Sequence, residues 1–194
     1  MRIHGYGGAV NYSALGDSLL KLPGNMNYLW SPWRMEYILT AKKDEGCIFC
    51  NCLAQMDGPD NLIVHRSSKA FVMLNRYPYT SGHLMIVPYE HKPSLELLDP
   101  ASRADVMEQA SRAVQVLGVL YSPQGFNLGM NIGGAAGAGI LEHVHLHVVP
   151  RWVGDTNFMS SVSQTRVLPE LLEETYRRVC AAWMDEKTDI EHTT

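Results

Sequence analysis

The 194-residue sequence contains no apolar run that approaches the roughly 20 residues of a membrane-spanning helix. It also lacks a run of lysine and arginine, and its formal net charge of −4 argues against a nucleic-acid duplex as the main partner. Its 4 cysteines are too few for a disulfide scaffold in a chain of this length. Residues 1–25 lack the basic segment and apolar core of a secretory signal. These absences predict a globular, cytoplasmic protein that does not use a membrane.

The composition supports one hydrophobic core, because 46% of the residues are hydrophobic and 19% are charged, as in ordinary globular domains. We predict a single domain over residues 26–194. Residues 1–25 are rich in glycine and asparagine and show little periodicity, so we predict a loosely ordered extension there.

The expected elements are short strands and two helices. We expect strands at 61–65, 70–74, 83–87, 126–132 and 143–149, a long helix between Asp99 and Pro123, and a final helix after Pro169. The strands do not alternate with helices. The order of these elements along the chain therefore predicts an α+β fold. It would contain an antiparallel sheet, one long central helix and a C-terminal helix.

Three histidines, His143, His145 and His147, alternate with apolar residues in the last expected strand. A period of two is strand geometry, so their rings should project from one face. They could be structural, form one metal site, or carry out nucleophilic and acid–base chemistry on a charged substrate. The outer two Cα atoms would lie about 13 Å apart, too far for all three rings to share an ion whose bonds are about 2 Å long. We favour the chemical interpretation, with the central ring as nucleophile.

A glycine-rich loop, GGAAGAG over residues 133–139, precedes the three histidines. Glycines let the backbone approach an anion, and successive N–H groups can form a nest for phosphate oxygens. The loop is not a Walker A motif, because no Gly-Lys-Ser/Thr follows. Such a loop alone is more often a plain turn, but its place beside the histidines favours phosphate binding.

A second motif is Cys47-Ile48-Phe49-Cys50. Such a CxxC pair is typical of half a zinc site, of a redox pair, or of two thiols in a core. The sequence has no second CxxC, which excludes a zinc ribbon. The remaining interpretations stay open on the residues alone.

The run HVHLHVV resembles the signature of the histidine triad (HIT) family of nucleotide hydrolases and transferases. The resemblance extends over residues 30–158 and includes CIFC, FVMLNR, SGHL, the glycine loop and PRW followed by GD. It is closest to the bacterial branch near the fragile histidine triad proteins. Members of that branch cleave dinucleoside polyphosphates by hydrolysis or phosphorolysis.

The resemblance implies a role for each histidine. His145 would attack the α-phosphorus to form a nucleotidyl-histidine, as suits an imidazole that is neutral near pH 7. The carbonyl of His143 would hold the proton on the other nitrogen of His145. His147 would bind phosphoryl or leaving-group oxygens, and His83 would complete the hydrogen-bond network.

The resemblance also implies a nucleotide-binding set. Asn75 would bind the ribose, Asn131 the phosphate, Met73 and Leu74 the base, and Gly137 and Gly139 the phosphate through their backbones. Two of these residues have simpler alternatives: that Asn75 only begins a turn, and that Asn131 only caps the loop. His4, His65 and His192 we expect at the surface.

Some members of the family bind a structural zinc ion, and the corresponding residues are Cys47, Cys50, His91 and His143. Cys2His2 is a common closed zinc site. The ion would fix the orientation of His143 and is not required for the chemistry. The alternative is two buried thiols and a solvent-facing His91.

One departure from the family is that residues 137–142, GAGILE, carry no hydroxyl or amide side chain. Other members have serine, threonine or glutamine there to assist the leaving group. The resemblance, together with this departure, implies an enzyme that cleaves dinucleoside tri- or tetraphosphates. The resemblance also implies a homodimer whose sheet continues across the subunits. The alternatives are a nucleoside phosphoramidate hydrolase, or a nucleotide-binding regulatory module with incidental turnover; a zinc-dependent hydrolase is a poorer fit.

Overall fold

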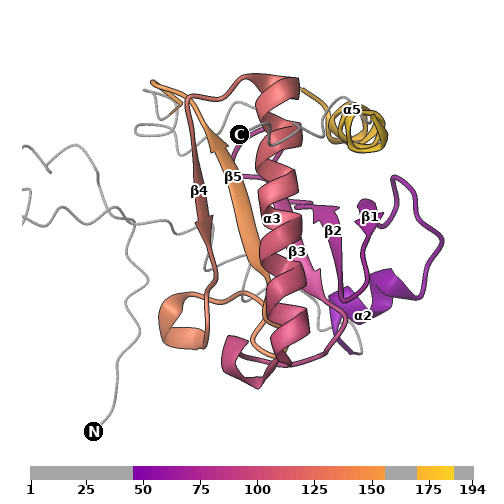
Figure 1. Cartoon of the computed structure of the whole chain (residues 1–194), viewed down its shortest axis with the longest axis vertical. Coiled ribbons are helices and arrows are strands. Elements are labelled where there is room, and N and C mark those ends of the chain that lie inside the picture. The colour runs from indigo at the N-terminus through magenta and orange to yellow at the C-terminus, as the bar shows by residue number, and fades with distance from the viewer. Residues whose placement is uncertain (1–45, 156–169, 186–194) are drawn as a thin grey trace, which may run out of the picture. The chain divides into compact units, whose positions relative to one another are not determined.

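The computed structural model describes residues 46–155 and 170–185, all within the compact unit formed by residues 40–194. The predicted domain boundary at residue 25 lies outside the described residues. In chain order the elements are α2 (Ile48–Leu53), β1 (Ile63–Arg66), β2 (Ala70–Leu74), β3 (Leu84–Pro88), the 3-10 turn η2 (Leu95–Leu97), α3 (Pro100–Tyr121), β4 (Gly125–Gly129), the 3-10 turn η3 (Gly134–Ala136), β5 (Leu146–Arg151) and α5 (Leu172–Met184) (Figure 1).

The five strands form one sheet in the order β1-β2-β3-β5-β4, and all four pairings are antiparallel. Strand β5 lies between β3 and β4, with His147 opposite Met85 on one side and Gly129 on the other. The α+β fold with an antiparallel sheet, a long central helix and a C-terminal helix is confirmed.

Helix α3 begins where the sequence predicts. The side chain of Asp99 accepts a 2.7 Å hydrogen bond from the N–H of Ser102, and Pro100 occupies the first turn. The helix ends at Ser122, whose left-handed backbone has a φ of +45°. Its inner face packs on the sheet, and α5 packs against α3 and β1 (Figure 1).

Alternation along the strands creates two apolar layers, one on each face of the sheet. Leu74, Ile86 and Val148 belong to the large layer beneath α3 and α5. On the opposite face, Met73 and Met85 pack with Phe49 of α2 in a smaller layer. The smaller layer is on the face of the sheet on which His147 lies beside Met85.

This alternation corrects one predicted contact. Met73 and Leu74 are neighbours on β2, so they point to opposite faces of the sheet. Leu74 is 1% exposed in the layer beneath α3. It therefore cannot join Met73 against a nucleotide base, and only Met73 remains a candidate.

The histidine strand is also shorter at its start than predicted. Strand β5 begins at Leu146, so His143 and His145 precede it and only His147 lies within it. The cause is the connector after β3. The N–H of Val144 donates to the carbonyl of Lys92 at 2.7 Å, so this stretch pairs with the connector and not with β4.

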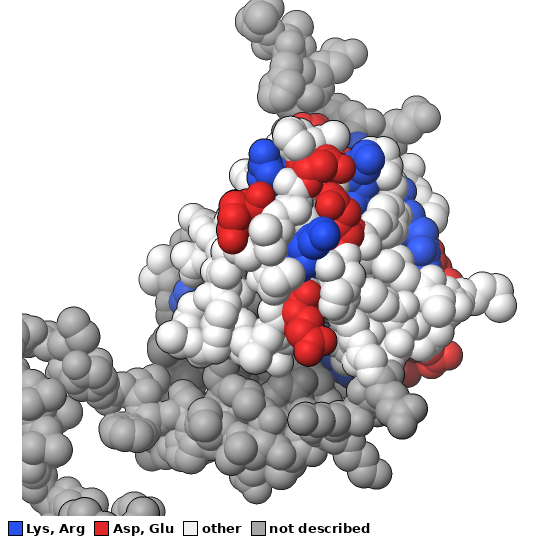
Figure 2. All heavy atoms as spheres, turned by 90° about the horizontal axis from the view of Figure 1, so that it is seen from below, with Lys and Arg blue, Asp and Glu red and all other residues white. Residues whose placement is uncertain are grey.

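No helix within the described ranges is long and apolar enough to cross a membrane. The face drawn in Figure 2 carries acidic and basic side chains interspersed, without a broad patch of one sign.

Candidate functional site

The protonation of His145 is fixed by its position. Its ring is 5% exposed, and Nδ1 lies 2.9 Å from the carbonyl oxygen of His143. Because a carbonyl only accepts, Nδ1 must carry the proton and Nε2 keeps its lone pair. Burial lowers the pKa of His145 below its usual value, although the bond to the His143 carbonyl opposes this shift. The ring is therefore a neutral imidazole with Nε2 as its nucleophilic atom.

His83 and His147 form a second fixed arrangement beside His145. The N–H of Tyr79 donates to Nδ1 of His83 at 3.1 Å, so the proton of a neutral His83 is on Nε2. That nitrogen lies 3.0 Å from Nδ1 of His147, which must accept. The proton of His147 is consequently on Nε2. The His147 ring lies 4.8 Å from that of His145, centroid to centroid.

Gly82 places His83 at the start of β3. Its φ of +77° belongs to the left-handed region that favours glycine. A Cβ at this position would lie 3.0 Å from Leu117 and 3.1 Å from Tyr121, both on α3. The turn between β2 and β3 therefore needs glycine here, both for its backbone angle and for its close approach to the helix.

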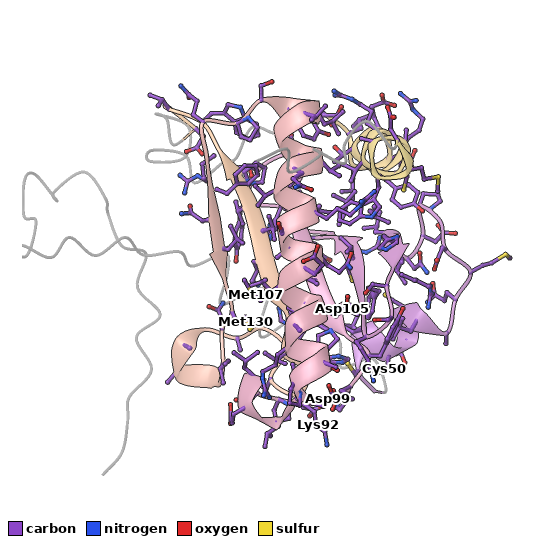
Figure 3. The ribbon with its side chains drawn as sticks, viewed as in Figure 1. Cys50, Lys92, Asp99, Asp105, Met107 and Met130 are labelled. Carbon is purple, nitrogen blue, oxygen red and sulfur yellow. The ribbon has the colours of Figure 1, made fainter. Side chains whose placement is uncertain are left out.

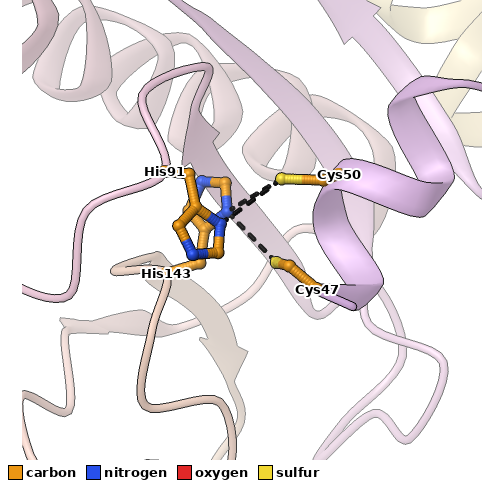
Figure 4. Close-up of side chains that lie close together, drawn as sticks. All are labelled: Cys47, Cys50, His91 and His143. Atoms are coloured by element: carbon orange, nitrogen blue, oxygen red, sulfur yellow. Dashed lines mark hydrogen bonds between the residues drawn. The ribbon is translucent and has the colours of Figure 1, made fainter. Parts of the chain in front are cut away.

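Four side chains that can ligate a metal ion lie close together (Figure 4). Nδ1 of His143 is 3.3 Å from Sγ of Cys47 and 3.8 Å from Sγ of Cys50, and Nδ1 of His91 is 3.4 Å from Sγ of Cys50. All four ligand atoms lie within 4.8 Å of one another. They come from the start of α2, the connector after β3 and the segment before β5.

These residues fit a zinc ion. Tetrahedral zinc with bonds of about 2.0–2.3 Å sets neighbouring ligand atoms about 3.3–3.8 Å apart, as the three distances here are. Nε2 of His143 donates to the carbonyl of Pro88 at 2.8 Å, which leaves Nδ1 as the ligating atom. Burial, with smaller contributions from His91 and His145, lowers the pKa of His143 and favours the neutral ring that a metal requires. The four predicted ligands are therefore together and able to hold a metal ion.

The glycine loop is closed by its own hydrogen bonds. The N–H of Gly137 donates to the carbonyl of Gly134 at 3.0 Å, and the side-chain amide of Asn131 donates to the carbonyl of Gly137 at 3.5 Å. The predicted phosphate nest cannot use the N–H of Gly137 without breaking this turn. Gly139 lies beyond the turn, and its role in binding phosphate stays a prediction.

Asn75 makes the local contact expected of a residue that begins a turn. Its Oδ1 accepts a 2.9 Å hydrogen bond from the N–H of Tyr77, which begins the turn between β2 and β3. Its N–H donates to the carbonyl of His83 at 2.9 Å. Asn75 therefore has a structural role, and its contact with a ribose stays a prediction.

Two site residues were missed from the sequence. Phe49 is 1% exposed, and its ring lies 5.3 Å from that of His143 and 4.9 Å from that of His145. Tyr79 lies 4.7 Å from the ring of His83 and 6.3 Å from that of His147. Phe49 stands inside the CxxC motif, where the apolar position between the cysteines was a usable signal. Tyr79 sits in a turn and carries no such signal.

Comparison with known proteins identifies one family. The model of the HIT domain matches residues 58–153. A relative from Mycobacterium tuberculosis named AP-4-A phosphorylase is 38% identical over 162 residues, which cover 80% of this chain and 83% of the relative. A bis(5'-nucleosyl)-tetraphosphatase (asymmetrical) from Schizosaccharomyces pombe is 28% identical over 93 residues, 48% of this chain and 50% of the relative.

Among solved structures, a zinc-bound histidine triad family protein from Mycobacterium smegmatis is similar with a TM-score of 0.58 and 27% identity. The match covers 71% of this chain and 93% of that protein.

Proposed function

Because the chain belongs to the HIT domain family, we propose that it is an enzyme that cleaves dinucleoside polyphosphates at the α-phosphorus. The names of the two relatives, a phosphorylase and a tetraphosphatase, support this substrate class. The observation that carries the proposal is the fixed proton of His145. Its Nδ1–H points to the His143 carbonyl, so Nε2 keeps its lone pair for attack, and the His145 ring contacts that of His147.

In the proposed reaction, Nε2 of His145 forms a bond to the α-phosphorus, and the bond from phosphorus to the bridging oxygen breaks. The leaving group departs with that electron pair. The nucleotidyl-imidazole that results is a cation, and the carbonyl of His143 stabilises its Nδ1–H. Nε2–H of His147 donates to the oxygen that gains charge. Phosphate, or water that loses a proton to the solvent, then attacks phosphorus, and the electron pair of the phosphorus–nitrogen bond returns to Nε2.

The metal cluster has a structural part in this proposal. Zinc bound by Cys47, Cys50, His91 and His143 would supply a fixed cross-link and no reacting group. Through His143 it would hold the carbonyl that fixes the proton of His145. The chemistry itself is carried by side chains.

Chemical trapping tests the proposal. Acid-labile, base-stable nucleotide should be found on the protein when a reaction with labelled diadenosine tetraphosphate is quenched rapidly. His145→Ala should abolish the label while nucleotide binding is retained. Steady turnover by the wild type without any trapped label would exclude the covalent mechanism, and tight binding without turnover of any polyphosphate would favour a regulatory module.

We propose phosphorolysis over hydrolysis, since the M. tuberculosis relative named as a phosphorylase is 38% identical to this chain. Phosphate attack on an adenylyl-histidine gives ADP, whereas water gives AMP. The product should therefore change from AMP to ADP when inorganic phosphate is added. ADP formation that does not depend on added phosphate would contradict phosphorolysis.

A homodimer through β4 and α3 is also proposed. Strand β4 is an edge of the sheet in the described residues, and its Leu128 is 45% exposed. Met107 of α3, labelled in Figure 3, is 57% exposed and Val119 is 62% exposed. Exposed apolar side chains beside an open edge favour a second copy. Light scattering should give twice the chain mass, and a monomer at micromolar concentration would contradict the proposal.

The cysteines of the described part are free thiols, which supports a cytoplasmic location.

A further inference from the structure

The hydrogen bonds around His83 and His147 run in one direction. A backbone N–H, that of Tyr79, begins the series; His83 accepts it at Nδ1 and donates from Nε2; His147 accepts at Nδ1. The backbone N–H cannot reverse its role. The direction of both later bonds, and hence the position of both ring protons, therefore depends on Tyr79.

This arrangement resists an additional proton. A proton added to Nδ1 of His147 would face the N–H of His83, and one added to Nδ1 of His83 would face the N–H of Tyr79. Either addition replaces a hydrogen bond by two opposed N–H groups. Loss of the Nε2 proton from a neutral His147 is equally unfavourable, because it would leave an imidazolate anion.

The ring of Tyr79 also packs against the rings of His83 and His147. It is tilted by 34° to the ring of His83 and by 30° to that of His147, with centroids 4.7 Å and 6.3 Å away. A second fixed point secures the turn, since Oγ1 of Thr80 donates to the carbonyl of Pro150 on β5 at 3.0 Å. The ring of His145 also contacts that of His147, and its Nδ1–H is already directed at a carbonyl.

The loop before the histidines offers no substitute acid. Residues 133–141 contain only glycine, alanine, isoleucine and leucine, and Glu142, which follows them, is exposed. Neither the histidine pair nor residues 133–141 can therefore give a proton to a departing group.

We propose that Tyr79 is a positioning residue that keeps His147 a hydrogen-bond donor and prevents it from acting as a proton donor. As a consequence, the site accepts only substrates whose leaving group departs as a stable anion. The phosphoanhydrides of dinucleoside polyphosphates meet this condition, and alkyl phosphoramidates, whose amine must be protonated as it leaves, do not. The inference rests on the proposed nucleotidyl transfer to His145.

Matched substrates test the consequence. Adenosine 5′-phosphoramidates with an alkylamine and with a weakly basic arylamine are compared with diadenosine tetraphosphate, using the full-length, metal-loaded protein. General-acid catalysis is worth about 10²–10⁴-fold, so kcat/KM for the alkylamine should be at least about 100-fold below that for the tetraphosphate. The arylamine should lie between them. Values within tenfold of each other for all three substrates would overturn the proposal.

Two variants distinguish the contribution of the Tyr79 backbone N–H from that of the Tyr79 ring. Tyr79→Pro removes the N–H, so Nδ1 of His83 can accept a proton, and the alkylamine penalty should shrink by about tenfold or more. Tyr79→Leu keeps the N–H and should keep the penalty, whatever its effect on the overall rate. An unchanged penalty in folded Tyr79→Pro would overturn the proposal.

A substrate-free measurement distinguishes failure of this inference from failure of the proposed function. Nitrogen-15 NMR of labelled histidine should show His83 and His147 both neutral at pH 7, each protonated on Nε2. A proton on Nδ1 of His83 would overturn the proposal even if every nucleotide is cleaved as expected. If no nucleotide is cleaved but the protons are placed as stated, the proposed function fails and the role of Tyr79 in holding the pair stands.

Discussion

His145 contacts two groups of residues that are built differently, one through His143 and the other through His147. On one side, Cys47, Cys50, His91 and His143 bring four ligand atoms together from three chain segments. On the other side, a backbone N–H and two imidazoles form a directed pair of hydrogen bonds. The first support can hold a metal ion between its thiols and imidazoles, whereas the second consists of hydrogen bonds between protein groups. The proposed nucleophile is thus supported by a group of residues that can bind a metal ion and by a pair of histidines that needs none.

Metal removal should give the largest loss of stability. It should change the surroundings of His143 and leave those of His83 and His147 unchanged. Chelation leaves two thiols and two imidazoles without their common partner, so the melting temperature should fall by more than about 10 °C, as for loss of several kcal/mol in a domain of this size. Calorimetry with and without chelator measures this. The NMR signals of His83 and His147 should keep their tautomers while that of His143 changes. If the NMR signals of His83 and His147 changed together with that of His143 in a protein that stays folded, the two supports would not be separate.

Phe49→Ala should have the next largest effect. The Phe49 ring packs against the rings of both His143 and His145 and belongs to the smaller apolar layer. Loss of a buried phenyl ring typically reduces the free energy of unfolding by about 3–5 kcal/mol. Denaturant unfolding measures the change, and Phe49→Leu, which keeps most of the volume, is the control. The rate of nucleotide labelling of His145 should fall more than metal affinity does. An equal fall in both would mean that Phe49 acts on the metal cluster alone.

Thr80→Val tests the metal-independent side with a smaller change. The substitution removes the hydroxyl that donates to the carbonyl of Pro150 and keeps the side-chain volume. We expect a loss of about 1 kcal/mol in the free energy of unfolding. Metal content, measured by atomic absorption, should stay stoichiometric. A substantial loss of metal in this variant would contradict the independence of the two supports.

The smallest effect is expected from mild acid. Burial lowers the pKa of His145, so the neutral nucleophile should persist below the usual histidine value of about 6.5. The labelling rate should therefore stay nearly constant from about pH 7.5 to about pH 6.5 and fall only below that range. Between the folded and unfolded pKa values the unfolded state binds more protons, so stability also decreases as pH falls. Metal content is measured at each pH, and a halving of the rate near pH 6.5 in the metal-loaded protein would contradict this expectation.

Much of the fold could be predicted from local patterns. The long helix was anticipated because Asp99 is an N-cap and Pro100 follows it, and both signals are local. The ligand set was anticipated only through the resemblance to a family, and the structure brings its four members together. Strand β5 was predicted three residues too early, because the pairing of Val144 with Lys92 joins residues far apart in sequence. His65, expected at the surface, instead stacks on Trp183 of α5 at 5.5 Å, and burial lowers its pKa.

The sequence by itself determined which chemistry is available: alternating imidazoles, a CxxC pair, and a preceding loop without hydroxyl or amide side chains. These are properties of residue type and spacing, which are local. Only the tertiary structure decided which nitrogen of each ring carries its proton. That choice depends on the carbonyls of His143 and Pro88 and on the N–H of Tyr79. Two of these three groups belong to segments distant in sequence from the rings of His143, His145 and His147, and folding alone brings them within hydrogen-bonding distance of the site.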